Sequence, residues 1–81
     1  MTDNEIQSLI QEQLSDADVH VEGDGYHFVA RVVSPAFDSL STVKRQQAVY
    51  ACVSDKIASG EIHALTVKAF SPDEWQQNKD K

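Results

Sequence analysis

The stretch that most constrains the fold runs from Val19 to Val33, VHVEGDGYHFVARVV, where apolar and polar residues alternate around Gly-Asp-Gly. Alternation at every second residue is typical of strands with one buried face. Glycines accept the positive φ that tight hairpin turns need. The stretch therefore predicts a β-hairpin that turns at Gly23 and Gly25, and its second strand places Phe28, Ala30 and Val32 on one face.

Helical periodicity precedes the hairpin and returns after it. Thr2 followed by Glu5 fits a capping box, and a helix is expected from about Asp3 to Leu14. After Pro35 and a short irregular connection, Ser41 is a suitable N-cap for a second helix over residues 42–59. We expect this helix to bury a stripe of apolar side chains with a core thiol beside it: Val49, Val53, Ile57 and Cys52.

A third strand and a short helix are expected in the last quarter of the chain. GEIHALTVKAF, from Gly60 to Phe70, is typical of a strand. Ser71, Pro72 and Glu74 then form a capped helix start. The ordered core is expected over residues 3–75, with residues 76–81 as a frayed polar tail.

The order helix, strand, strand, helix, strand, short helix predicts one α+β domain over residues 1–81. Two strands joined through a helix are parallel if they are neighbours, and the crossover is right-handed. We therefore expect a three-stranded mixed sheet in the order 1-2-3, with helices covering one face.

Composition excludes several function classes. The chain has 81 residues, a formal net charge of −6 and a single cysteine. The charge disfavours strong non-specific binding to nucleic acid or to an anionic membrane, and no apolar run is long enough to span a bilayer. The cysteine count excludes an intrachain disulfide and a cysteine-rich zinc site. We expect a cytoplasmic protein. Because the sequence contains no recognised catalytic motif, we do not expect an enzyme.

Two histidines are expected at one end of the sheet. His27 lies near the start of the second strand and His63 at the start of the third. Neighbouring strands are about 4.8 Å apart, so two imidazoles at parallel strand starts can reach one site. His20, on the first strand, is expected toward the same end. Whether the two rings point to the same face stays open, and a hydrogen-bonded surface role is the commonest one for such histidines.

Three stretches together resemble the BolA family, and most closely its bacterial IbaG type. They are GDGYHFVARVVSPAFDSLS, VKRQQAVY and IHALTVKAFSPDEW, and the resemblance covers about Ile6 to Trp75. It implies a KH-like fold, similar to class II, with the order α-β-β-α-β-α, in agreement with the patterns above.

The resemblance also implies a function. BolA-like proteins bind monothiol glutaredoxins, and the pair holds a bridging 2Fe–2S cluster that is used in iron–sulfur cluster assembly or transfer and in iron homeostasis. The cluster is shared with glutaredoxin and glutathione, and none is expected in the isolated protein, which would be a monomer or a weak homodimer. By position His63 is the first expected ligand. The second is His27, with His20 or a loop residue near Asp24 left open.

Two alternatives remain. Some BolA-like proteins regulate transcription by binding DNA, and the basic residues available for this on the KH-like surface are Lys44, Arg45 and Lys68. The chain lacks the GXXG loop with which KH domains clamp RNA, and the first turn of a helix normally exposes its Lys and Arg side chains. The other alternative is an adaptor that binds its partner without any metal.

Overall fold

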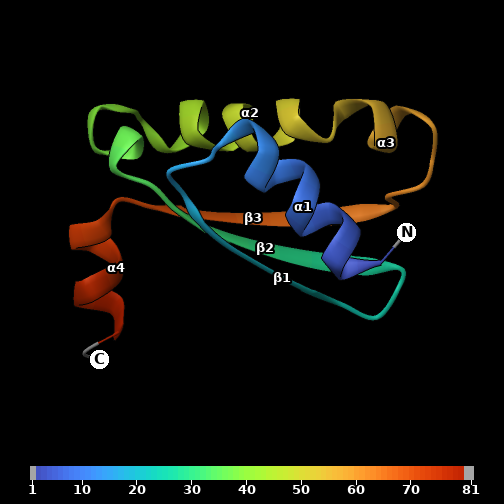
Figure 1. The fold of residues 1–81 in the computed structure, drawn as a ribbon, viewed down its shortest axis with the longest axis horizontal. Coiled ribbons are helices and arrows are strands. Elements are labelled where there is room, and N and C mark those ends of the chain that lie inside the picture. Colours follow the sequence, from blue (N-terminus) through green and yellow to red (C-terminus); the bar gives the residue numbers. More distant parts are fainter. Residues whose placement is uncertain (1, 80–81) are drawn as a thin grey trace.

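The computed structural model describes residues 2–79 and confirms the predicted α+β class and element order (Figure 1). A short 3-10 helix, η1, forms the connection after the hairpin. None of the helices described is long and apolar enough to cross a membrane. The elements are α1 (Asp3–Gln13), β1 (Asp18–Gly23), β2 (His27–Val33), η1 (Pro35–Ser39), α2 (Thr42–Cys52), α3 (Ser54–Ala58), β3 (Ala64–Phe70) and α4 (Pro72–Lys79).

The sheet has the predicted order β1-β2-β3, with β2 in the centre. β1 pairs with β2 antiparallel, and β2 pairs with β3 parallel, so that His27 lies opposite Ala64 and Val33 opposite Phe70. The hairpin turn and the start of β3 therefore lie at one end of the sheet. α4 leaves from the other end (Figure 1).

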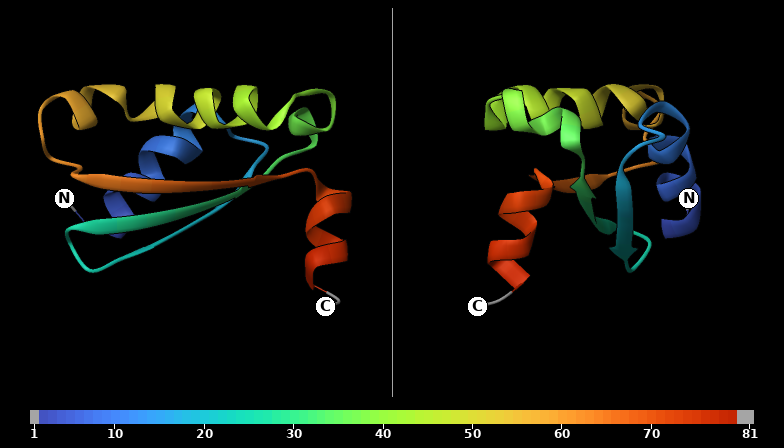
Figure 2. Two further views of the ribbon diagram at one scale, coloured as in Figure 1. Left: turned by 180° about the vertical axis from the view of Figure 1, so that it is seen from behind. Right: turned by 60° about the vertical axis from the view of Figure 1, so that its left-hand side comes forward.

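One face of the sheet is covered by α1, α2 and α3 (Figure 2). The inward side chains of β2 are completely or almost completely buried, as the alternation predicts. The helices contribute apolar residues at helical spacing to the same core. Its largest members are Ile6, Ile10, Phe28, Val32, Phe37, Val49 and Val53.

The expected coverage of one face holds for α1 to α3, whereas α4 lies at the end of the sheet beside the opposite, outer face (Figure 2). Trp75 on α4 contacts Phe70, with ring centroids 5.5 Å apart, and lies beneath the guanidinium of Arg31 on β2. The outer face of the sheet is thus left open along β1 and β2 and is bounded by α4 at one end.

The single helix expected over residues 42–59 is divided at Val53. There the backbone has φ −128° and ψ 14°, and the Val53 N–H donates to the Tyr50 carbonyl, three residues back. The break changes the helical phase, so Val49 and Val53 are buried while Ile57 is 39% exposed. The prediction that Ile57 belongs to the buried stripe is therefore wrong.

Cys52 packs against the core from the last turn of α2, in agreement with its expected role as a core thiol. Its Sγ donates to the Ala48 carbonyl at 3.3 Å. Burial raises the pKa of this thiol, which keeps it protonated and unreactive at neutral pH.

α4 begins as predicted but extends further. The Ser71 hydroxyl accepts a hydrogen bond from the Glu74 N–H, and the Glu74 carboxylate accepts one from the Ser71 N–H. This reciprocal cap satisfies two donors at the helix start. The helix continues to Lys79, beyond residue 75 at which the ordered core was expected to end, and residues 80–81 lie outside the described residues.

Candidate functional site

The β1–β2 turn is held by the carboxylate of Asp24. Its Oδ1 accepts hydrogen bonds from the backbone N–H groups of Tyr26 and His27, both at 2.9 Å. These donors, the His27 N–H first, lower the pKa of Asp24 and keep it ionised. These hydrogen bonds therefore fix the backbone positions of Tyr26 and His27 at the end of the sheet.

The two turn glycines serve different purposes. Gly25 has φ +95°, as predicted. Gly23 does not have a positive φ, which corrects the prediction for this residue. It is required because a Cβ there would collide with the Phe28 ring and approach the His27 carbonyl oxygen to 2.7 Å.

His63 is placed by the connection between α3 and β3. The neighbouring Ile62 is buried, and its N–H donates to the Lys56 carbonyl at 3.1 Å, which anchors the connection to α3. Gly60, with φ +83°, allows the chain to leave α3. His63 follows as an exposed residue just before β3 begins.

The aromatic ring of Tyr26 joins the two histidines. It stacks on the imidazole of His63 with centroids 4.8 Å apart and planes 15° apart, and it meets the imidazole of His27 edge-on at 4.8 Å. The prediction that His27 and His63 lie at one end of the sheet is confirmed. We call these three residues the histidine edge.

The strand ladder fixes the face of one imidazole only. His27 is opposite Ala64 in the ladder and alternates with the buried Phe28, so it belongs to the outer face. His63 precedes the ladder, and strand parity therefore does not fix its ring. Both histidines are exposed, and neither ring is hydrogen-bonded to another described residue.

The histidine edge offers two imidazoles as potential metal ligands. Within residues 2–79, no three His, Cys, Asp or Glu side chains come together in a way that could hold a metal ion. A 2Fe–2S cluster is normally held by four thiolate ligands, and imidazoles can replace the two thiolates on one iron. The donor set therefore fits such a cluster only when a second molecule completes it.

His20 does not lie at this edge, so its expected position is wrong. It is opposite Arg31 in the middle of the β1–β2 ladder, because the register starts with Gly23 opposite Phe28. Its Nε2 pairs with the Glu22 carboxylate at 2.9 Å, and this hydrogen bond lowers the pKa of Glu22.

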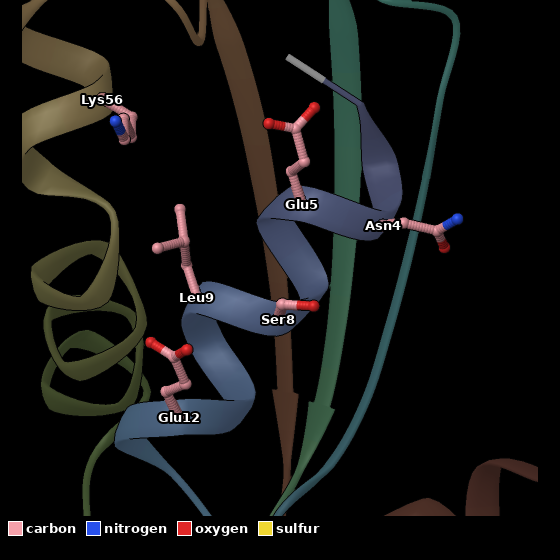
Figure 3. Close-up of a pocket in the computed structure, with 6 residues that line it drawn as sticks. All are labelled: Asn4, Glu5, Ser8, Leu9, Glu12 and Lys56. Carbon is pink, nitrogen blue, oxygen red and sulfur yellow. The ribbon is translucent and has the colours of Figure 1, made fainter.

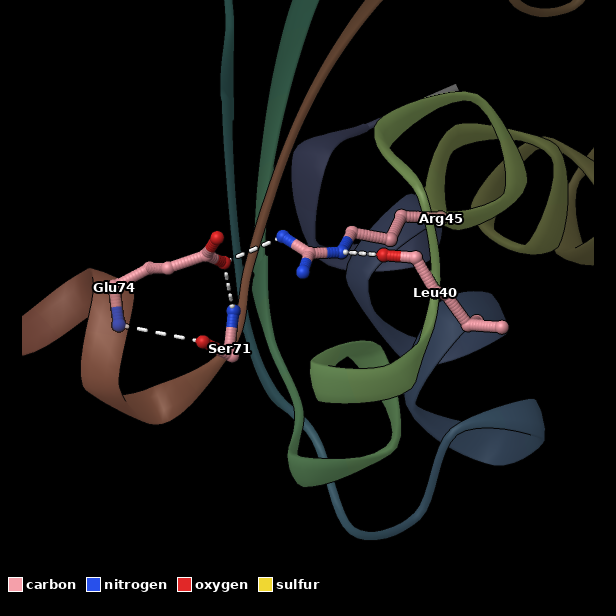
Figure 4. Close-up of polar contacts among 4 residues, drawn as sticks. All are labelled: Leu40, Arg45, Ser71 and Glu74. Atoms are coloured by element: carbon pink, nitrogen blue, oxygen red, sulfur yellow. Dashed lines mark hydrogen bonds and ion pairs between the residues drawn. The ribbon is translucent and has the colours of Figure 1, made fainter.

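Arg45 is a structural residue rather than an exposed cation, which corrects its expected place on a basic surface. It is 8% exposed, its Nε donates to the Leu40 carbonyl at 2.9 Å, and its Nη1 pairs with the Glu74 carboxylate (Figure 4). The contact ties α2 to α4. Lys44 and Lys68 remain exposed, on α2 and on the outer face of β3.

A groove on the outer face was not anticipated from the sequence. It has a volume of about 450 Å³, and we call it the outer-face groove. The alternation along β2 indicates that Arg31 and Val29 share a face of the sheet. No local sequence pattern, however, predicts that Trp75 packs against Arg31. The groove is lined by His20, Glu22, Val29, Arg31, Lys68, Phe70 and Trp75.

A hollow of about 400 Å³ between α1 and α3 carries little chemistry (Figure 3). Two of its charged side chains already interact with other groups of the protein. Glu5 closes the capping box of α1, and Lys56 pairs with Glu61 at 3.4 Å. Asn4, Ser8, Leu9 and Glu12 also line it, and the Ser8 hydroxyl has no histidine beside it among the lining residues that could act as a base.

Comparison with known proteins gives concordant matches. Residues 5–74 match the family model described as "BolA-like protein". The Acid stress protein IbaG of Escherichia coli is 46% identical over 79 residues, which cover 98% of this chain and 94% of the relative.

Two solved structures are similar as well. The bolA protein homologue from Coxiella burnetii has a TM-score of 0.82 and 36% identity, covering 94% of this chain and 97% of that one. The BolA domain of SufE1 from Arabidopsis thaliana has a TM-score of 0.76 and 31% identity, covering 89% and 93% respectively.

Proposed function

The chain belongs to the BolA-like family, and from this membership and the histidine edge we propose that it is the partner of a monothiol glutaredoxin. In this proposal the two proteins share a 2Fe–2S cluster, which the complex passes on in iron–sulfur cluster assembly and iron homeostasis in the cytoplasm. The protein binds and positions the cluster and is not itself an enzyme.

The observation that supports this proposal most directly is the position of Tyr26 against both imidazoles. His27 and His63 come from two different strand starts, yet each lies 4.8 Å from the same aromatic ring. Their ring nitrogens are open to another molecule, because both residues are exposed and free of hydrogen bonds from the other described residues.

His63 is the first proposed ligand and His27 the second. The other options are less suitable. His20 is held by Glu22 in the outer-face groove. Asp24 already accepts two backbone hydrogen bonds through Oδ1, which fix the turn.

Tyr26 sets the geometry of ligand presentation in this proposal. Its ring lies against His63 and is 56% exposed, so it can move without opening the core. A cluster bound by both imidazoles requires Tyr26 to swing away. The glutaredoxin would supply its own thiolate and that of glutathione, and nitrogen ligands raise the potential of such a cluster.

Protonation opposes ligation, because a metal-bound imidazole must be neutral. Acidification through the range in which histidine ordinarily titrates is therefore expected to release the cluster. The E. coli relative is named an acid stress protein, which is compatible with a site of this kind.

The nucleic-acid alternative has less support than it had from the sequence. Arg45 is buried in the pair with Glu74, and Lys44 and Lys68 lie on different elements of a chain with a net charge of −6. Strong binding to DNA requires several phosphates to be neutralised together.

The proposal is tested by mixing the protein with a monothiol glutaredoxin, ferrous iron, sulfide and glutathione without oxygen. We expect a heterodimer on gel filtration with two irons per pair, in line with one 2Fe–2S cluster, and a visible spectrum different from that of the glutaredoxin alone. A heterodimer without iron would instead support the metal-free adaptor.

A further inference from the structure

Three basic side chains form a row across the outer face of the sheet. His20 lies opposite Arg31 on one side, and Lys68 lies opposite Arg31 on the other. Like charges directly opposite each other in a sheet are destabilising. Glu22 pairs with His20, whereas neither Arg31 nor Lys68 forms an ion pair with any other residue in the described part of the chain.

Arg31 is held by stacking rather than by hydrogen bonds. Its guanidinium carbon lies 4.5 Å from the centroid of the Trp75 ring, and its Nε–H is buried with no partner among residues 2–79. Buried donors are usually paired, because desolvation without a partner is costly. Stacking on an aromatic ring restricts an arginine while leaving its planar group able to receive a carboxylate.

Apolar surface accompanies these cations. Val29 is 39% exposed between them and the histidine edge, and Phe70 lines the groove beside Trp75. We propose that the outer-face groove binds an acidic segment of a partner protein. One carboxylate lies between Arg31 and Lys68, and an adjacent apolar side chain packs on Val29, toward the histidine edge.

Charge complementarity is local in this proposal. The chain as a whole carries −6, but at physiological ionic strength charges are screened beyond about 8 Å. A carboxylate inside the groove therefore responds chiefly to the two neighbouring cations. Glu22 is the nearby acid; its carboxylate is hydrogen-bonded to His20 on β1, two strands away from Lys68 on β3.

A protein segment fits this groove better than single-stranded nucleic acid. Nucleic-acid grooves of this kind stack bases on open aromatic faces and follow several phosphates. The Trp75 ring is covered by Arg31 and contacted by Phe70, and Glu22 lines the groove. The inference does not rest on the cluster proposal, because none of the residues that line the groove belongs to the histidine edge.

A peptide selection tests the proposal. A random short-peptide library displayed on phage is selected separately on the wild-type protein and on the R31Q/K68Q variant. The strongest peptides are then synthesised and titrated, with the fluorescence of Trp75, the only tryptophan in the chain, as the signal. Oligothymidylate is titrated in parallel, and K44Q removes the same charge from α2, outside the groove.

We expect Asp- and Glu-rich peptides from the wild type alone, with affinity reduced at least about tenfold in R31Q and in K68Q and unchanged in K44Q. Thermal unfolding of each variant shows whether it is folded, and K68Q tests the groove if R31Q is not. The proposal is overturned if no acidic peptide is enriched, if both variants bind as the wild type does, or if oligothymidylate binds and the peptides do not.

Discussion

The Tyr26 ring lies parallel to the imidazole of His63, with planes 15° apart and centroids at 4.8 Å. Tyr26 comes from the β1–β2 turn, and His63 comes from the connection that enters β3. The stack therefore joins two segments that are far apart in the sequence. It holds the imidazole of His63 in one orientation.

Removing the Tyr26 ring is expected to release His63. Protons above an aromatic face are shifted upfield, so the His63 ring protons should move downfield in Y26A in a proton–carbon NMR spectrum. Y26F is the matched control, because it keeps the ring and removes only the hydroxyl. If the His63 resonances are the same in Y26A and the wild type, the two rings do not stack in solution.

The hairpin turn predicts a strict requirement for glycine at position 23. A Cβ there would collide with the Phe28 ring, so G23A should lower the free energy of unfolding by about 1–3 kcal/mol, as overpacking does. G25N is the comparison, since asparagine tolerates positive φ and a side chain at Gly25 meets no other atom. Denaturant unfolding of both variants is the measurement. Equal stability of G23A and the wild type would contradict the turn geometry.

The break at Val53 predicts unequal roles for two residues that the sequence places on one stripe. Val49 is buried and Ile57 is 39% exposed. V49A should cost about 2 kcal/mol through the cavity it leaves, whereas I57A should stay within about 0.5 kcal/mol of the wild type. Urea unfolding of the two variants compares them directly, and a larger loss in I57A would indicate one continuous helix.

Glu74 predicts a pH-dependent attachment of α4. The Ser71 N–H, and then Arg45, lower the pKa of Glu74 below its usual range. A carboxylate with a lowered folded-state pKa stabilises above its unfolded-state pKa, and this contribution is lost as the pH falls through the folded-state value. E74Q should therefore melt at a lower temperature than the wild type at neutral pH, and the difference should vanish in acid.

Thermal unfolding followed by Trp75 fluorescence at several pH values measures this effect. E12Q is the matched control, because Glu12 is an exposed glutamate on α1, away from α4. A melting difference between E74Q and the wild type that persists unchanged at low pH would show that the carboxylate charge does not hold α4.

Local patterns predicted much of the fold. The element order, the caps at Thr2 and Ser71, and the meeting of His27 and His63 at one end follow from periodicity, capping chemistry and the rule for parallel strands. Each of these depends on residues close in sequence or on a topological rule. Local patterns and topological rules do not determine how side chains from distant segments contact one another.

The corrections all involve contacts or geometry that local patterns do not encode. Arg45 is buried because Glu74, 29 residues later, reaches it. His20 misses the edge because the hairpin register begins beside Gly23, and the helix containing Val53 breaks without a glycine or proline. Trp75 covers Arg31 only because α4 turns toward the outer face.

The most direct test of the central claim compares the three histidines in the reconstituted glutaredoxin complex. H63A and H27A are each mixed with the glutaredoxin, iron, sulfide and glutathione, and H20A serves as the control from the outer-face groove. Visible absorption and circular dichroism report the cluster, and calorimetry without iron reports partner binding. We predict an altered or lost cluster spectrum in H63A and H27A, with apo affinity kept, and a wild-type spectrum in H20A. An unchanged spectrum in H63A would contradict the claim.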